Sequence, residues 1–242
     1  MWAVFKREVA SFFLSPIGYI FLCIFVFLSG FFFTMSILPQ SADVMPAVNY
    51  ADTLGTMTFT LLFVVPILTM KLLSEERKNG TDILLMTSPV SIAGIVGGKY
   101  LAAVFEFLVG LIITMIYPII LSFFTKIDTN VILTGYVGIF LVGAAFIAIG
   151  IFASSLSKNQ ITSAILGFCF LLVLWVFEAL KALLNLSEAG QKFLDGFLVL
   201  KKYDEFSAGL FDIGAVIFFI SFIFLFLFLT FRTIEKRRWS EG

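Results

Sequence analysis

Six long apolar segments divide the 242-residue sequence, and they restrict the folds that it can adopt. They lie at about residues 17–38, 56–73, 100–124, 131–156, 160–180 and 213–232. Apolar runs of roughly 18 residues or more are typical of helices that cross a bilayer, because a helix satisfies its own backbone hydrogen bonds there. The alternating apolar and polar pattern of a membrane barrel is absent from the sequence. We therefore predict an all-α membrane protein with six transmembrane helices in a single domain, residues 1–242.

The composition supports this class and excludes most catalytic sites. Hydrophobic residues make up 60% of the chain and charged residues only 13%, against about 25% charged in ordinary globular proteins. The sequence contains no histidine, which removes bis-histidine haem, most zinc sites and nucleophiles paired with histidine. The formal net charge of zero indicates no nucleic-acid partner, and Cys23 and Cys169 lie in apolar runs, where we expect buried thiols rather than a disulfide. We expect no enzyme activity, metal or cofactor on this chain.

The positions of lysine and arginine predict which side of the membrane each loop occupies. With six spans both termini lie on one side, and that side would hold eleven of the sixteen basic residues. The loop at residues 39–55, on the other side, contains none. We therefore predict a multi-pass membrane protein with both termini in the cytoplasm. A second outer segment, residues 181–212, is expected to form one or two short helices at the outer leaflet.

The first 15 residues are predicted to form an amphipathic helix in the cytoplasmic interface of the membrane. Large apolar residues recur at steps of three and four, as on one face of a helix, and they are Trp2, Phe5, Val9 and Phe12. The charged residues Lys6, Arg7 and Glu8 fall off that stripe. Pro16 is expected to end this helix before the first span, because proline disrupts the interior of a helix.

A dense group of charges separates the second and third spans, at residues 74–91. The second helix is predicted to continue beyond the membrane through Glu75, Glu76 and Arg77. It is expected to end at Gly80, because glycine adopts the left-handed conformation after a helix at little cost. A solvated loop is the alternative interpretation of this segment.

A second, short helix is predicted to follow this bend. Thr81 is suited to its N-cap, Asp82 to its first turn and Pro89 to its end. Its apolar body includes Leu84 and Leu85. A helix so short and apolar is unstable alone in water and needs a groove to occupy, which indicates a docking partner.

The same segment resembles a known family. The order Glu75, Gly80-Thr81, Leu84-Leu85, Pro89, Ser91 and Gly98-Lys99 is similar to the signature of type-2 ABC transporter permeases, with the gliding-motility (GldF-like) subgroup most similar. The N-terminal residues Lys6 to Tyr19 and the basic ending Arg237-Arg238 also match, so the resemblance extends over nearly the whole chain. It implies the type-2 exporter-like permease fold. In that family the segment between spans two and three is a coupling helix that docks into a cleft of a separate ATP-binding subunit.

The resemblance implies that the chain is the permease subunit of an ATP-driven exporter in the bacterial plasma membrane. The implied partners are an ATP-binding cassette subunit, which would hold ATP and magnesium, and a second permease copy or a homologous permease. Membrane lipids and an auxiliary extracellular protein are further candidate partners. The residues that would couple to the ATP-binding subunit are Glu75, Glu76, Arg77, Gly80, Thr81, Asp82, Leu84, Leu85 and Pro89. A chain with 32 phenylalanines suits an amphiphilic or lipid-linked substrate better than a hydrophilic ion.

The stretch Gly94–Tyr100 does not meet the requirements of a phosphate-binding loop. That loop needs a glycine five residues before Gly98, where the chain has Ala93. It also needs serine or threonine after Lys99, where the chain has tyrosine. ATP hydrolysis is therefore expected in a partner subunit.

Two acidic residues lie within the predicted spans. Glu106 belongs to the third span, and Glu178 lies near the outer end of the fifth. An ionisable group inside the membrane is costly and indicates either a functional site or a buried partner. A structural role is the simpler interpretation of both. If they are functional, the chain is instead a secondary transporter or channel, which is the alternative hypothesis.

Overall fold

The computed structural model of the chain describes residues 1–37, 50–81, 91–124, 128–183 and 199–240. These ranges are mostly helical and contain no strand. The helices are α1 (Trp2–Leu14), α2 (Pro16–Ile37), α3 (Tyr50–Thr69), α4 (Lys71–Lys78), α6 (Ile92–Thr114), α7 (Ile116–Ser122), α8 (Thr129–Leu156), α9 (Gln160–Leu183), α11 (Lys201–Ser207) and α12 (Ile213–Ser240).

Within the described ranges, six helical stretches are long and apolar enough to cross a membrane, as the sequence predicts. They are Pro16–Ser36, Thr53–Lys78, Ile92–Ser122, Thr129–Leu156, Gln160–Phe177 and Ile213–Arg238. The third spanning helix, α6, begins at Ile92 and not near Tyr100. The side chain of Ser91 caps α6, because it accepts a hydrogen bond from the backbone N–H of Gly94. Its first two turns therefore extend the span toward the charged segment.

The helix α8 runs through the middle of the bundle and contacts α3, α6, α9, α11 and α12. Glycines on α8 let its neighbours approach closely. A methyl group at Gly143 would overlap the ring of Phe107 in α6, and one at Gly150 would overlap Thr69 at the end of α3. The outer helices α9 and α12 bury far less of their surface and present apolar side chains outward.

The two cysteines lie on this outward surface, so the prediction that they are buried was wrong. Cys23 and Cys169 are both exposed and free. In a membrane helix the outward face meets lipid, so an apolar run does not by itself distinguish a core position from a lipid-facing one.

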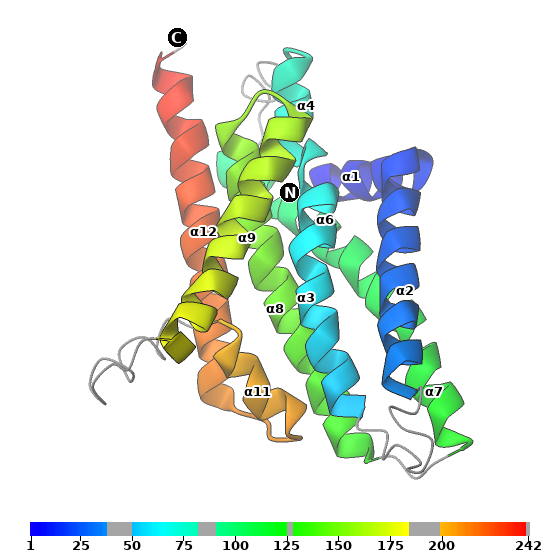
Figure 1. Cartoon of the computed structure of the whole chain (residues 1–242). Helices are drawn as coiled ribbons and strands as arrows, with labels where there is room; N and C mark the ends of the chain where they lie inside the picture. Colours follow the sequence, from blue (N-terminus) through cyan, green and yellow to red (C-terminus); the bar gives the residue numbers. More distant parts are fainter. Residues whose placement is uncertain (38–49, 82–90, 125–127, 184–198, 241–242) are drawn as a thin grey trace.

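The helix α1 lies across one end of the bundle, next to the start of α2 (Figure 1). We call this end, which also carries α4 and the last turns of α12, the α1 end; α7 and α11 lie at the opposite end. The chain turns sharply between α1 and α2 because Ser15 has an extended backbone and Pro16 begins α2. A helix is therefore present where one was predicted, and it ends before Pro16.

The buried face of α1 differs from the predicted stripe. Val4, Glu8 and Phe12 are its buried residues, whereas Trp2 is 66% exposed. Glu8 was predicted to lie off the buried face, and it lies on it because a buried cation of another helix pairs with it, as described below. A pairing over such a distance in sequence cannot be read from the pattern of α1 alone.

The predicted outer segment 181–212 contains one short described helix, α11. Its residues Tyr203 and Phe206 are buried against α8, where they lie close to Gly138. Residues 184–198 of this segment lie outside the described ranges.

Candidate functional site

The charged arm that precedes the predicted docking segment is helix α4, which ends in a well-formed glycine motif. Gly80 has a φ of 67°, in the left-handed region. Its N–H donates to the carbonyl of Arg77 (3.4 Å), and the N–H of Thr81 donates to the carbonyl of Glu76 (2.9 Å). This pair of bonds is the Schellman motif, which fixes the direction in which the chain leaves a helix. The predicted termination at Gly80 is confirmed.

The residues beyond this turn are only partly described. Thr81 closes the motif, and its hydroxyl also donates to the carbonyl of Glu76 (3.3 Å). The predicted docking residues Asp82, Leu84, Leu85 and Pro89 lie outside the described ranges. The described part of the segment is therefore its base, and the next described helix, α6, begins at Ile92.

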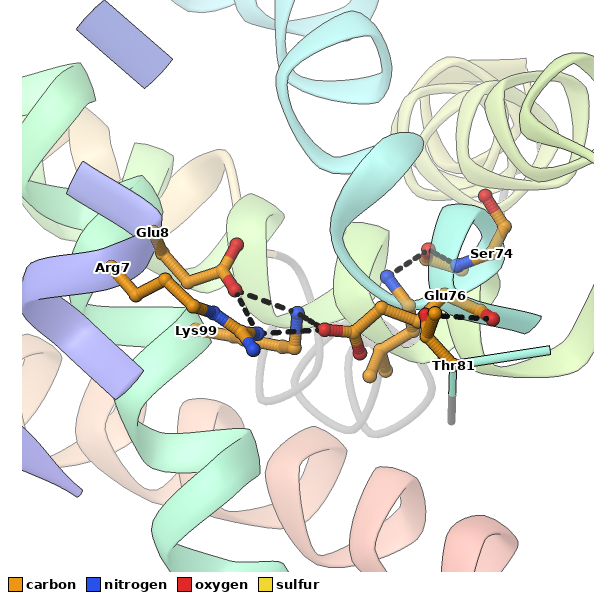
Figure 2. Close-up of polar contacts among 8 residues, drawn as sticks. Arg7, Glu8, Ser74, Glu76, Thr81 and Lys99 are labelled. Carbon is orange, nitrogen blue, oxygen red and sulfur yellow. Dashed lines mark hydrogen bonds and ion pairs between the residues drawn. The ribbon is translucent and has the colours of Figure 1, made fainter. Parts of the chain in front are cut away.

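Four charged side chains from three helices meet at this base, and Figure 2 shows them pointing toward one another. We call Arg7, Glu8, Glu76 and Lys99 the charge cluster. The Lys99 ammonium lies 3.0 Å from a carboxylate oxygen of Glu8 and 2.9 Å from one of Glu76. The Arg7 guanidinium lies 2.7 Å from each of the same two oxygens. The cluster thus joins α1, α4 and α6.

Burial makes the cluster a strong constraint. The side chain of Lys99 is 1% exposed and those of Glu8 and Glu76 are 11% and 16% exposed, whereas that of Arg7 is 53% exposed. Burial raises the pKa of Glu8, but the Lys99 charge and the hydrogen bonds from Arg7 and Lys99 outweigh it, so the pKa lies below its usual value. A buried charge that loses its partner is strongly destabilising, so the three helices are held in one arrangement.

An open cleft of about 270 Å³ lies beside the charge cluster. The cluster lines it together with Ser11, Lys71 and Glu75. Its charges balance, because Arg7, Lys71 and Lys99 face Glu8, Glu75 and Glu76.

A second contact holds the break between α3 and α4. The Ser154 hydroxyl, in the last turn of α8, accepts hydrogen bonds from the backbone N–H groups of Leu73 and Ser74, both at 3.1 Å. It donates to the carbonyl of Met70 at 3.2 Å. The N-terminus of α4 therefore receives its cap from another helix.

The next residue of α8 binds two arginines. The backbone carbonyl of Ser155 accepts from the guanidinium of Arg77 in α4 (3.2 Å) and from that of Arg237 in α12. Cations are favoured at the C-terminal end of a helix, where carbonyl groups lack intrahelical partners. The predicted coupling residues Glu76 and Arg77 are thus both bound within the chain.

The two intramembrane acids differ in how far they are described. Glu106 lies in α6 and is 1% exposed. Among the described residues, neither of its carboxylate oxygens has a hydrogen-bond partner. Glu178 lies in α9, with its side chain outside the described part of the chain.

Sequence reasoning did not find Glu8, Lys99 and Ser154 as parts of this site. A signal for Glu8 exists, because Val4, Glu8 and Phe12 follow one another at four-residue steps and so share a face of α1. Lys99 stood out in the family signature and in the failed phosphate-loop match, and neither pairs it with a carboxylate. Ser154 gives no local signal, since its partners lie about 80 residues away.

Comparison with known families gives one match over this region. The model of the family described as "ABC-2 family transporter protein" matches residues 43–185. The matched stretch runs from the residues before α3 to the end of α9, and so includes α4, the docking segment and α8. No curated protein matches the chain.

Proposed function

We propose, since the chain belongs to the ABC-2 transporter family as a membrane-spanning permease, that a separate ATP-binding subunit drives it through residues 74–91. The observation that carries the proposal is the rigid base of this segment. The Schellman motif at Gly80 fixes the exit of the chain from α4, and the charge cluster fixes α4 against α1 and α6. A force applied to the segment would therefore reach the spans instead of being lost in a loose loop.

The predicted coupling residues divide into two roles in this proposal. Glu76 and Arg77 anchor α4 through Lys99 and the Ser155 carbonyl, so they position the segment. Gly80 and Thr81 set its direction. Asp82, Leu84, Leu85 and Pro89 would form the part that enters the ATP-binding subunit, with Glu75 at the rim of the cleft.

The transport role follows from the same premise. The excess of basic residues on the terminal side supports a cytoplasmic α1 end, where an ATP-binding subunit has access to the segment. The apolar, aromatic outer helices support an amphiphilic or lipid-linked substrate moved outward. A second permease copy or a homologous permease would complete the pathway, and an auxiliary extracellular protein could join on the α11 side. The N-terminal motif from Lys6 to Tyr19 supports placement near the gliding-motility (GldF-like) subgroup.

Two glycines give a matched pair of variants for the test. Gly209 ends α11 at the opposite end of the bundle with a φ of 84°. Its N–H donates to the carbonyl of Phe206 (3.1 Å), and the N–H of Leu210 donates to that of Glu205 (3.0 Å), which is the motif of Gly80 repeated. Proline cannot adopt positive φ or donate that bond, so it breaks either motif at a similar cost.

The experiment purifies the tagged chain from its native host in mild detergent and assays for a co-purifying ATP-binding subunit with ATPase activity. We expect wild type and Gly209→Pro to retain that subunit and Gly80→Pro to lose it. Loss from both variants would attribute the effect to general misfolding and remove the support for the segment. A stable wild-type preparation without any ATP-binding subunit would overturn the proposal and favour a secondary transporter or channel that uses Glu106 and Glu178.

A further inference from the structure

The buried carboxyl group of Glu106 is unlike the other charged groups at the α1 end. Glu8 and Glu76 each lie within 3.0 Å of buried Lys99, whereas Glu106 has no hydrogen-bond partner among the described residues, although it is only 1% exposed. It lies in a span, two turns deeper than Lys99. A lone ionised carboxylate in such a place costs at least several kcal/mol.

The elements packed against α6 supply few charges to this carboxyl. The helices α2, α7 and α8 contain no acidic or basic residue. In α1, Arg7 and Glu8 belong to the charge cluster, and Lys6 lies over the ring of Trp2. In α12, Arg232 pairs with Glu235 at 2.9 Å, Arg237 binds the Ser155 carbonyl, and Lys236 and Arg238 lie in the last turns.

Among the described residues, Lys71 is the buried cation that does not belong to the charge cluster. It is the first residue of α4 and is itself buried. Its ammonium group donates to the Ser15 hydroxyl at 2.9 Å and lies 4.3 Å from the centre of the Phe12 ring. Lys71 thus holds α4 to the corner between α1 and α2 and does not bind Glu106 directly. Glu8 and Glu75 also attract it, and Lys99 repels it.

We propose that Glu106 is a proton-binding site, that it holds its proton in this conformation, and that Lys71 controls the release of that proton. A buried carboxyl group without an ion-pair partner is stable when it is neutral. When Lys71 leaves Ser15 and approaches Glu106, the O–H bond breaks, the proton passes to water in the cleft that Lys71 lines, and a carboxylate–ammonium pair forms. The reverse movement returns the proton. No oxidant, metal or further reactant takes part.

The proton site stands on burial and geometry, and only its link to transport rests on the proposed function. Lys71 begins α4, the helix that leads to the segment at residues 74–91. The charge cluster holds α4 against α6, so Lys71 would reach Glu106 by rotation of its own long side chain away from Ser15. A change at the segment that breaks the contact with Ser15 would therefore couple proton binding to the state of that segment.

The test records infrared spectra of the purified full-length chain at neutral pH. We expect the C=O band of a protonated carboxyl group in the wild type and its loss in Glu106→Gln. Glu8→Gln is the matched control, because it removes a salt-bridged carboxylate and should leave that band in place. In Lys71→Met the band should persist to higher pH than in the wild type, by about one pH unit, because a nearby positive charge favours the ionised form.

The outcomes separate the two parts of the proposal. If the spectrum of Glu106→Gln lacks carboxylate bands of the wild type and keeps its neutral-acid band, the proton site is overturned. An unchanged titration in Lys71→Met would overturn the control by Lys71. If Glu106→Gln does not fold, modification of the wild type by a hydrophobic carbodiimide tests the site, because that reagent requires a protonated carboxyl; absence of an adduct at Glu106 would refute it. Co-purification of an ATP-binding subunit is measured separately, so failure here does not bear on that proposal.

Discussion

Replacement of Ser154 by alanine should loosen the break between α3 and α4. The hydroxyl accepts from two backbone N–H groups, of Leu73 and Ser74, and donates to the carbonyl of Met70. Interhelical hydrogen bonds in membrane proteins average about 0.6 kcal/mol each. Loss of all three should therefore lower the free energy of unfolding by about 2 kcal/mol. For a chain of this size that corresponds to a fall in melting temperature of about 4–8 °C.

Ser155 provides a control that is matched in position and burial. Its hydroxyl donates to the carbonyl of Phe152 in its own helix (2.7 Å), and its backbone carbonyl, which binds the two arginines, is unchanged by Ser155→Ala. The melting temperatures of both variants and of the wild type are measured in detergent. The readout is the fraction of protein that still elutes as a monodisperse species after heating. We expect Ser154→Ala to melt several degrees lower than Ser155→Ala. Equal melting temperatures would refute the assignment of Ser154 as the cap of α4.

Three further variants test the charge cluster and the packing of the bundle. Lys99→Met should lower the free energy of unfolding by about 3 kcal/mol, because it leaves two buried carboxylates with only a half-exposed cation. Arg7→Met should lower it by less than about 1 kcal/mol. Similar losses for the two variants in thermal melts would contradict the burial argument. The pKa of Glu8 is lowered below 4.5 in the folded chain, so its stabilisation is present above that pH and lost as the pH falls through the folded value. Wild type should therefore approach the melting temperature of Glu8→Gln on acidification, and a constant difference would contradict the lowered pKa. Gly143→Ala should destabilise by about 1–3 kcal/mol through overlap with a buried ring, whereas Gly55→Ala, which meets nothing within 4 Å, should not; equal melting of the two would argue against close packing on α8.

The sequence was sufficient for the features that depend on neighbouring residues. Long apolar runs predict the six spans because the bilayer sets the length of a helix. Gly80 predicts the end of α4 because the left-handed conformation is local to one residue. The family signature between the second and third spans falls within the region that the family model matches.

The candidate site was less predictable, because its contacts join residues far apart in sequence. Glu8 lies on the buried face of α1 only because Lys99, 91 residues away, pairs with it. Pro66 lies inside α3, which continues to Thr69 and breaks at Met70, where the Ser154 hydroxyl binds the backbone N–H groups of Leu73 and Ser74. The four-residue steps of Val4, Glu8 and Phe12 indicate a shared face of α1, but composition and spacing do not name the distant partner in either pairing.

The last turn of α8 has a mechanical consequence. A break in a long helix is usually a place where the helix bends, but the break at Met70 is braced by Ser154, and α4 beyond it is braced by the Ser155 carbonyl. These contacts would transmit a force on α4 to α8. Arg237, which binds the same carbonyl, would transmit it to α12. The charge cluster draws α1 along with α4 and α6. A load applied at α4 would therefore act on α1, α6, α8 and α12 together.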